Sequence, residues 1–344
     1  MSGLLAVQAE NHSQASWAVA TRTTGVDEAA FARQFDTGAI LRTHVLRSTW
    51  HYVRPEDIGW LLELTGPRVR RLFRSHQRAL GLDDSILDVA ATRIIEALAG
   101  GNHLTRDSLR ERLLADGLPA AGEATMVMAA HAELTGLICS GAMQDGRHTY
   151  ALLAERAPKS RRLGRDEALA ELALRYFTGH GPATERDLAY WATLTLTDVR
   201  SGLAAVADQL HSFEHDGRIF WSGAPAPAEA PHPRAHLLQI LDEYYRGYQD
   251  SRWVLDVDGL AGRDREALAG MVLIDGQFAG DMRRTIAGDR VRFEIGLRRS
   301  LGDDERVALD DAARRYATFL GREHQVDAIG GLAHTPTSLI LAPH

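Results

Sequence analysis

Near the start of the chain, an amide and a carboxylate stand one residue apart, in Leu-Leu-Ala-Val-Gln-Ala-Glu-Asn. The amide of Gln8 donates and accepts hydrogen bonds, and the carboxylate of Glu10 accepts them, so the two could hold a water molecule between them. Residues two apart lie on one side of an extended chain but point in different directions on a helix. Because Gln and Glu are mostly exposed, residue type alone favours an ordinary helix end at the surface, and the water-holding pair is the alternative.

Two clusters of cations form a second candidate for chemistry. The single lysine is Lys159, so almost every cation is an arginine, whose planar guanidinium suits bidentate contacts with phosphate or guanine. The clusters consist of Arg68, Arg70, Arg71, Arg74 and Arg78, and of Arg156, Lys159, Arg161, Arg162 and Arg165. The codon usage of a GC-rich genome would also replace lysine with arginine, and this explanation needs no function.

Composition limits the class of protein. A length of 344 residues suggests two or three domains, and 45% hydrophobic and 25% charged residues are ordinary for globular chains with buried cores. No run approaches 18 apolar residues and no signal peptide is visible, so we expect no membrane span. One cysteine, Cys139, excludes a disulfide within the chain and favours a cytoplasmic location. The net charge of −7 counts against nucleic-acid binding, although net charge does not describe distribution.

Two stretches share one order of elements. Residues 83–157 predict three helices and then two β runs around Asp145-Gly146, with Thr105 as the cap of the second helix. Residues 165–221 repeat this order around Asp216-Gly217, with Thr184 as the equivalent cap. Three helices followed by a hairpin are typical of a winged helix. We therefore predict a mainly α fold with small β wings, built from tandem winged helix-turn-helix domains.

The remaining chain completes the predicted domain organisation. The N-terminal part shows a helix, a β region and a long helix, as in a shortened third copy, and the C-terminal part shows strands around Asp275-Gly276 and a closing amphipathic helix. The predicted domains are an N-terminal winged helix (1–82), a second (83–160) and a third (161–222), a Pro-rich linker (223–235), and a C-terminal α+β domain with an antiparallel sheet (236–344).

Several motifs in the sequence do not indicate a functional site. His211, Glu214 and His215 match the zinc signature H-x-x-E-H, but they run into the wing strand, where alternation splits their faces, so no metal site is predicted. No P-loop, G-x-S-x-G or G-x-G-x-x-G is present, and no cofactor is expected. The third helix of the first copy has no Arg or Lys, and that of the second copy has only Arg200. This favours a scaffolding role for these helices over the reading of DNA bases. The aromatic clusters at 50–53 and 242–248 favour core packing, with nucleobase stacking as the alternative.

Three segments resemble a known family, the tandem winged-helix DNA glycosylases of bacteria (AlkZ-like and YcaQ-like proteins). The segment 3–23 is similar to the one that carries the family's catalytic triplet, here Gln8-Ala9-Glu10. The second segment matches an R-T-x-x-x-R-x-T-x-H pattern, and the third a D-E-x-x-x-G-Y-x-D-R pattern. The residues that match these two patterns and that we single out are Arg42, Thr43, Arg47, Thr49 and His51, and Tyr248 and Arg252. The resemblance covers nearly the whole chain.

The resemblance implies a monofunctional glycosylase that removes N7- or N3-alkylated purines from double-stranded DNA and, in some members, unhooks interstrand crosslinks. Glu10 would be the general base and stabilise an oxocarbenium-like sugar, while Gln8 would position the water. Arg42 and Arg47 would hold phosphates, and the other matching residues would also contact DNA. Such an enzyme is expected to work as a monomer without cofactor, metal or membrane.

This chain departs from the family pattern in three places. The triplet ends in Glu10 rather than Gln or Asp, and the added methylene could move the carboxylate by about 1 Å, enough to slow a reaction in a fixed site. The family usually has a further helix before the triplet, so either the start codon is assigned late or the first domain is short. The stretch Gly-Asp-Met-Arg-Arg-Thr lacks a tryptophan often found there. The alternatives are a non-catalytic tandem winged-helix DNA-binding or regulatory protein, and a protein scaffold without DNA affinity.

Overall fold

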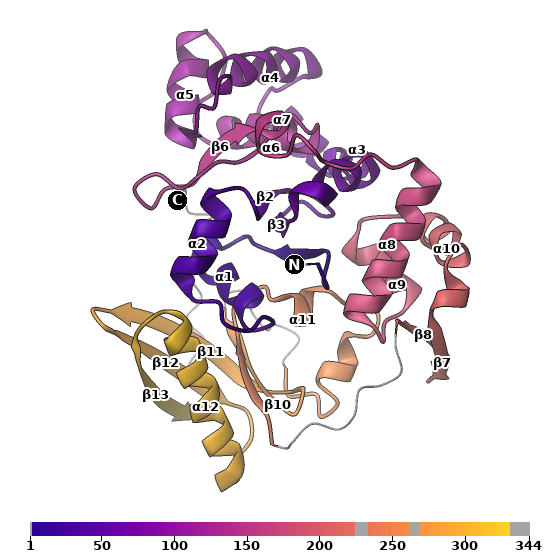
Figure 1. Cartoon of the computed structure of the whole chain (residues 1–344), viewed down its shortest axis with the longest axis vertical. Helices are drawn as coiled ribbons and strands as arrows, with labels where there is room; N and C mark the ends of the chain where they lie inside the picture. Colours follow the sequence, from indigo (N-terminus) through magenta and orange to yellow (C-terminus); the bar gives the residue numbers. More distant parts are fainter. Residues whose placement is uncertain (1, 224–232, 262–268, 331–344) are drawn as a thin grey trace. The chain divides into compact units, whose positions relative to one another are not determined.

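The computed structural model describes residues 2–223, 233–261 and 269–330 (Figure 1). Contacts divide the chain into two compact units. The first unit contains Met1–Glu10, Ala32–Pro225 and Gly247–Gln249, and the second contains Asn11–Phe31, Ala226–Arg246 and Asp250–His344. The two units are described separately below. The predicted division of 1–222 into three winged helices stays a prediction.

Short antiparallel sheets and helices make up the first unit. Its elements are β1 (Ala6–Gln8), β2 (Leu41–His44), β3 (Trp50–Val53), α3 (Pro55–Ala79), α4 (Asp84–Leu98), β4 (Leu104–Thr105), α5 (Arg106–Ala115), α6 (Glu123–Leu134), β5 (Ile138–Ser140), β6 (Thr149–Leu152), α7 (Leu153–Arg156), α8 (Arg165–His180), α9 (Glu185–Trp191), α10 (Leu196–Ala204), a 3-10 turn (Ala207–Gln209), β7 (His211–His215) and β8 (Arg218–Ser222). Its sheets have the orders β1-β3-β2, β4-β6-β5 and β7-β8. Helix α2 (Glu28–Asp36) spans the boundary between the units.

The predicted order of three helices and a hairpin is present in both stretches: α4, α5, α6 and β5–β6, then α8, α9, α10 and β7–β8 (Figure 1). Both predicted caps are confirmed. The hydroxyl of Thr105 accepts from the N–H of Ser108, and Thr184 forms a reciprocal capping box with Asp187. The Asp-Gly pairs turn both hairpins with positive φ at each residue, 49° and 74° in the first and 49° and 68° in the second.

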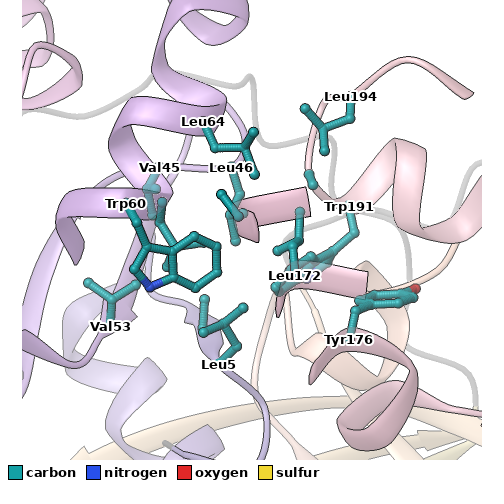
Figure 2. Packing of buried hydrophobic residues seen from close by; sticks show 14 of the residues in the cluster. Leu5, Val45, Leu46, Val53, Trp60, Leu64, Leu172, Tyr176, Trp191 and Leu194 are labelled. Carbon is teal, nitrogen blue, oxygen red and sulfur yellow. The ribbon is translucent and has the colours of Figure 1, made fainter. Parts of the chain in front are cut away.

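One large core lies under β1–β3, α3, α8 and α9 of the first unit. Trp60 from α3, Leu172 and Tyr176 from α8, and Trp191 from α9 belong to it (Figure 2). Leu5, just before β1, is in the same cluster and is fully buried. A separate core fills the space between α4, α5, α6 and the β5–β6 hairpin. The first core is therefore the support for the strands that carry Gln8 and Arg42.

The second unit holds a five-stranded sheet. Its elements are α1 (His12–Ala20), β9 (Ala235–Leu238), α11 (Glu243–Arg246), a 3-10 turn (Arg252–Leu255), β10 (Gly270–Ile274), β11 (Gln277–Ala287), β12 (Arg290–Leu297), α12 (Asp303–Phe319) and β13 (Glu323–Gly330). The strand order is β13-β12-β11-β10-β9. The prediction of an antiparallel sheet was wrong at one edge, because β13 returns through α12 and pairs parallel with β12. The predicted turn at Asp275-Gly276 and the closing helix are confirmed.

The helix α1, which the sequence placed in an N-terminal domain, packs within the second unit. Trp17 stacks on Tyr316 of α12 with ring centroids 4.3 Å apart, and its indole N–H donates to the carbonyl of Leu237 at 2.7 Å. Most of the predicted linker, residues 224–232, lies outside the described residues. Among the described helices, none is both long enough and apolar enough to cross a membrane.

Candidate active site

The sheet β1-β3-β2 arranges the predicted site residues in two rows. Gln8 pairs with His51, which pairs with Thr43, so these three side chains project from one face. Val7, Tyr52 and Arg42 form the next row across the strands and project from the opposite face. Burial raises the pKa of the Tyr52 phenol, and the nearby Arg42 guanidinium partly counters that effect, so Tyr52 remains neutral at physiological pH.

Gln8 is not at a surface helix end, as residue type alone had favoured. It is the last residue of strand β1, and only 4% of it is exposed. Its Oε1 accepts a hydrogen bond from Nη2 of Arg47 at 2.9 Å. Leu46, directly before Arg47, has a φ of 65°, and a leucine in this region costs about 1–2 kcal/mol, which the buried position of Leu46 in the first core offsets.

A chain of hydrogen bonds fixes the orientation of the Gln8 amide. The Nδ1 of His51 lies 3.0 Å from the carbonyl oxygen of Thr49, which can only accept, so Nδ1 carries the proton. The Nε2 of His51 is then an acceptor, and Nη2 of Arg47 donates to it at 3.1 Å. The same Nη2 of Arg47 donates to Oε1 of Gln8. The amide nitrogen of Gln8 therefore points away from Arg47 and can donate to another group. Two side chains of the second predicted segment, those of Arg47 and His51, and the main-chain carbonyl of Thr49 thus act on Gln8.

Glu10 lies two residues further along the chain, in a bend just after β1, and is half-buried. One carboxylate oxygen, Oε2, accepts from the main-chain N–H of Trp50 at 3.2 Å. The main chain beside it is also fixed, because the N–H of Ala9 donates to the carbonyl of Trp50 at 2.7 Å. The carboxylate is therefore anchored through β3, the strand that also carries His51.

Arg42 is buried, with 5% of the residue exposed, and it bonds to the triplet rather than facing solvent. Its Nε donates to the carbonyl of Ala9 at 2.8 Å and its Nη2 to the carbonyl of Glu10 at 3.0 Å. The guanidinium carbon lies 4.3 Å from the centre of the Trp50 ring, within cation–π distance. Arg42 is thus a clamp on the main chain of the triplet. Arg47 is half-buried, and its guanidinium lies 5.7 Å from the ring of Tyr190.

The two threonines of the same segment carry buried hydroxyls. Among the described residues, neither Oγ1 of Thr43 nor Oγ1 of Thr49 has a hydrogen-bond partner. Thr43 shares the face of Gln8 and His51, and Thr49 directly precedes β3, the strand that carries His51. Buried hydroxyls in this state bind water or polar groups of a ligand, which makes this face a polar one inside an apolar core.

The third predicted segment divides between the two units. Tyr248 belongs to the first unit, where its hydroxyl donates to the carbonyl of His180 at 2.6 Å and its ring packs against the core. Arg252 belongs to the second unit, where its Nε donates to the carbonyl of Tyr245 at 3.1 Å and its guanidinium lies 4.4 Å from the Tyr245 ring. Both side chains thus bond to main-chain carbonyls of the protein.

Glu133 was missed by sequence reasoning. It lies near the end of α6 with no exposure, and its carboxylate accepts from the indole N–H of Trp50 and lies 2.5 Å from Nδ1 of His44. The sequence did hold a signal, since Glu133 falls between Ala132 and Leu134 in a helix of mainly apolar residues, where a carboxylate needs a partner.

The structure places the zinc-like motif in a strand, the context in which the sequence predicted that its three residues would not share a face. His211, Glu214 and His215 all lie in strand β7, where alternation puts Glu214 on the face opposite the two histidines. A search of the described residues found no group of three or more His, Cys, Asp or Glu side chains that could hold a metal ion.

The fold is that of a DNA glycosylase of known structure. It matches the Streptomyces sahachiroi DNA glycosylase AlkZ with a TM-score of 0.76, at 23% identity, over 95% of this chain and 92% of that one. The family model for AlkZ-like DNA glycosylases matches residues 1–319. The chain belongs to the AlkZ-like DNA glycosylase family, and the activity of this class is hydrolysis of the N-glycosidic bond.

A curated relative supports the same assignment. The interstrand DNA cross-link repair glycosylase of Streptomyces sahachiroi is 27% identical over 258 residues, which cover 71% of this chain and 69% of that protein. The resemblance predicted from the three segments is thereby confirmed at the level of the family.

Proposed function

We propose that this glycosylase excises N7- or N3-alkylated purines from double-stranded DNA, with Glu10 as the general base and Gln8 as the group that positions water. The observation that carries the proposal is the shared anchorage of the pair. Gln8 is oriented through Arg47 and His51, and Glu10 is held by the N–H of Trp50. Two separate contacts, one from Arg47 and one from the Trp50 N–H, thus fix an amide and a carboxylate that stand two residues apart in the chain.

The geometry supports a simple hydrolysis. An alkylated purine carries a positive charge, so it departs readily and leaves an oxocarbenium-like sugar, which the carboxylate of Glu10 stabilises. Water attacks C1′ as the bond to the base nitrogen breaks; the bonding electrons go to the purine and neutralise it, and Glu10 accepts the proton of the water. Because Oε1 of Gln8 bonds to Arg47, the Gln8 amide would act on this water as a donor.

The longer carboxylate at position 10 fits this site. One of its oxygens accepts from the Trp50 N–H, which holds the end of a side chain that is one methylene longer than aspartate. This contact reduces the freedom that the added methylene introduces, so the departure from the family pattern is compatible with activity.

DNA contact in this proposal involves α3 rather than the third helices of the predicted winged helices. The single cation of α10, Arg200, bonds to Glu185 on the neighbouring helix, and α6 has none. The second half of α3 instead carries cations for which, in the described parts of the chain, no acidic side chain lies within 4 Å: Arg70, Arg71, Arg74 and Arg78. We assign these to the phosphate backbone. The tandem winged-helix arrangement would then position α3 and the triplet on the duplex.

The proposal is tested on methylated duplex DNA by measuring release of free 7-methylguanine. Glu10→Gln keeps an oxygen that can accept from Trp50 but loses the base, so the single-turnover rate should fall by about 10²-fold or more, while the Kd for duplex changes little. Gln8→Ala should reduce the same rate. Glu111→Gln, an exposed position on α5, is the matched control and should retain the wild-type rate.

The test also separates the alternatives. Duplex binding without base release by the wild-type protein would indicate the non-catalytic reading, and absence of duplex binding at low salt would indicate a scaffold. The name of the curated relative adds a substrate to examine, a duplex with one interstrand crosslink. We propose that this chain also unhooks such a crosslink, which would appear as conversion of crosslinked to single strands on a denaturing gel. A monomeric state and a cytoplasmic location stay predictions.

A further inference from the structure

The buried carboxylate of Glu133 has a high desolvation cost, and the proposed mechanism does not use this group directly. Its side chain is fully buried, and among the described residues no arginine or lysine lies within 4 Å of it. Its partners are Nδ1 of His44 at 2.5 Å and the indole N–H of Trp50, 3.1 and 3.2 Å from the two carboxylate oxygens. Isolating a carboxylate from water costs several kcal/mol unless such partners compensate. Both partners lie on the sheet that carries the triplet.

Trp50 is the residue where this carboxylate meets Glu10. Its main-chain N–H donates to Oε2 of Glu10, and its carbonyl accepts from the N–H of Ala9. Its ring lies against the guanidinium of Arg42, which in turn holds the carbonyls of Ala9 and Glu10. The orientation of one indole therefore bears on both the carboxylate of Glu10 and the main chain that carries it.

We propose that Glu133 is a positioning residue for Glu10 that acts by fixing the indole of Trp50. This inference rests on the proposed function of Glu10. Without the acceptor on α6, the indole N–H would be buried and unpaired, and the ring would turn toward another acceptor. Arg42 would then lose the surface on which it lies, and the triplet would lose part of its support. His44 contributes by fixing the carboxylate that receives the indole.

A simpler role is possible for the same contacts, in which Glu133 only fastens α6 to β2 and β3. That role predicts lower stability with the same rate per folded molecule. A positioning role predicts a lower rate of the chemical step with unchanged DNA affinity. Thr125→Val supplies the matched control, because Thr125 makes a buried bond to the carbonyl of Ala120 at the start of the same helix and has no contact with Trp50.

The experiment compares Glu133→Leu, Glu133→Gln and Trp50→Phe in single-turnover release of 7-methylguanine at saturating enzyme. Trp50→Phe removes the indole N–H but keeps an aromatic ring and the main-chain N–H. We expect Glu133→Leu and Trp50→Phe each to slow the step by about 10- to 100-fold, the range for a misplacement of about 1 Å. Glu133→Gln keeps an oxygen acceptor and should restore most of the rate.

Non-additivity provides the sharper criterion. If the two residues act through one hydrogen bond, the double variant should be no slower than the slower single variant. Rates equal to that of Thr125→Val, or losses that multiply in the double variant, would overturn the proposal. So would a loss confined to DNA affinity.

A readout without catalysis separates this inference from the proposed function. In protein with ¹³C-labelled glutamate side chains, the Glu10 carboxyl signal is assigned by its loss in Glu10→Gln. Loss of the Trp50 N–H contact should change the chemical shift of the Glu10 carboxyl signal in Glu133→Leu, since a hydrogen bond to that carboxylate is removed. An unchanged Glu10 signal would overturn the positioning role even if the wild-type protein released no base. If the wild-type protein releases no base but Glu133→Leu changes the Glu10 signal, only the proposed function is overturned.

Discussion

Two groups of arginines in the first unit differ in what their guanidinium groups contact. Arg42 and Arg47 face inward and bond to Gln8 and to the carbonyls of Ala9 and Glu10. The arginines of the second half of α3 face outward: Arg71, Arg74 and Arg78 are exposed, and they recur on one side of the helix at intervals of three and four residues. The inner group therefore acts on the protein, whereas the outer group is available to anions in solution.

The inner and outer arginines are the same residue type, and they differ in how deeply they are buried. The pattern R-T-x-x-x-R suggested phosphate contacts for Arg42 and Arg47, as the clustering on α3 did for its arginines. Strand alternation, however, puts Arg42 on the face opposite Thr43, where it meets Trp50. An arginine with two carbonyl partners and 5% exposure has few donors left for a phosphate. Substitutions in the two groups should accordingly have different effects. Those in the inner group should lower the rate of base release, and those in the outer group should lower the affinity for duplex DNA.

The largest effect is expected from Arg42→Lys. Lysine keeps the charge but lacks the planar fork that reaches the carbonyls of Ala9 and Glu10 together. We expect the single-turnover rate to fall by about 10²-fold, with a Kd for duplex within a factor of about two. Arg33→Lys, an exposed position on α2, is the control. An affinity loss without a rate loss would place Arg42 among the phosphate contacts and erase the distinction between the groups.

An intermediate effect is expected from neutralising the outer group in Arg71→Gln, Arg74→Gln and Arg78→Gln combined. Each phosphate contact contributes about 0.9 to the slope of log K against log salt, so the slope should decrease by about 2 to 3. The rate at saturating protein should stay at the wild-type value. The matched control removes the same charge from Arg161, Arg162 and Arg165, whose partners are acidic residues of the protein itself. An equal decrease of the salt slope in both triple variants would show that net charge alone controls duplex binding and that α3 forms no specific DNA-binding surface.

Local features of this chain could be predicted from sequence, and the polar network could not. The caps at Thr105 and Thr184 and the Asp-Gly turns depend on residues within a few positions of each other, so they are visible in the sequence. The family resemblance identified Gln8, Glu10, Arg47 and His51 as important. Its assignment of DNA contacts to Arg47 and His51 stays a prediction. The bond from Arg47 to Gln8 could not be read from the sequence, because the register that aligns Gln8 with His51 is a property of three paired strands.

Long-range polar contacts explain the other omissions. Glu133 meets Trp50 across 83 positions of the sequence, and no local pattern specifies that pairing. The parallel return of β13 depends in the same way on the path of α12. The two cation clusters show this limit best. Each is a run of basic residues, and only the fold provides the acidic partners of one of them.

The smallest effect is expected from Arg165→Gln alone, which tests whether the second cluster is structural. Arg165 bonds to Asp198 at 2.7 Å; although burial opposes it, hydrogen bonds from Thr195 and Arg165 lower the pKa of Asp198. A lowered folded-state pKa stabilises the protein above the ordinary aspartate value of about 4, and this contribution is lost as pH falls through the folded value. Since Arg165 is largely exposed, the change at pH 7 should be about 0.2–1 kcal/mol.

Thermal denaturation at pH 7 and at a pH below the folded-state pKa of Asp198 measures this contribution. The variant should melt slightly below the wild type at pH 7, and the difference should shrink at the lower pH. Its salt slope for duplex binding should match the wild type, because a guanidinium that neutralises Asp198 releases no counterion from DNA. A lower salt slope in Arg165→Gln would show that this arginine leaves its carboxylate for a phosphate, and the inner, outer and paired arginines would then form a continuum in place of distinct groups.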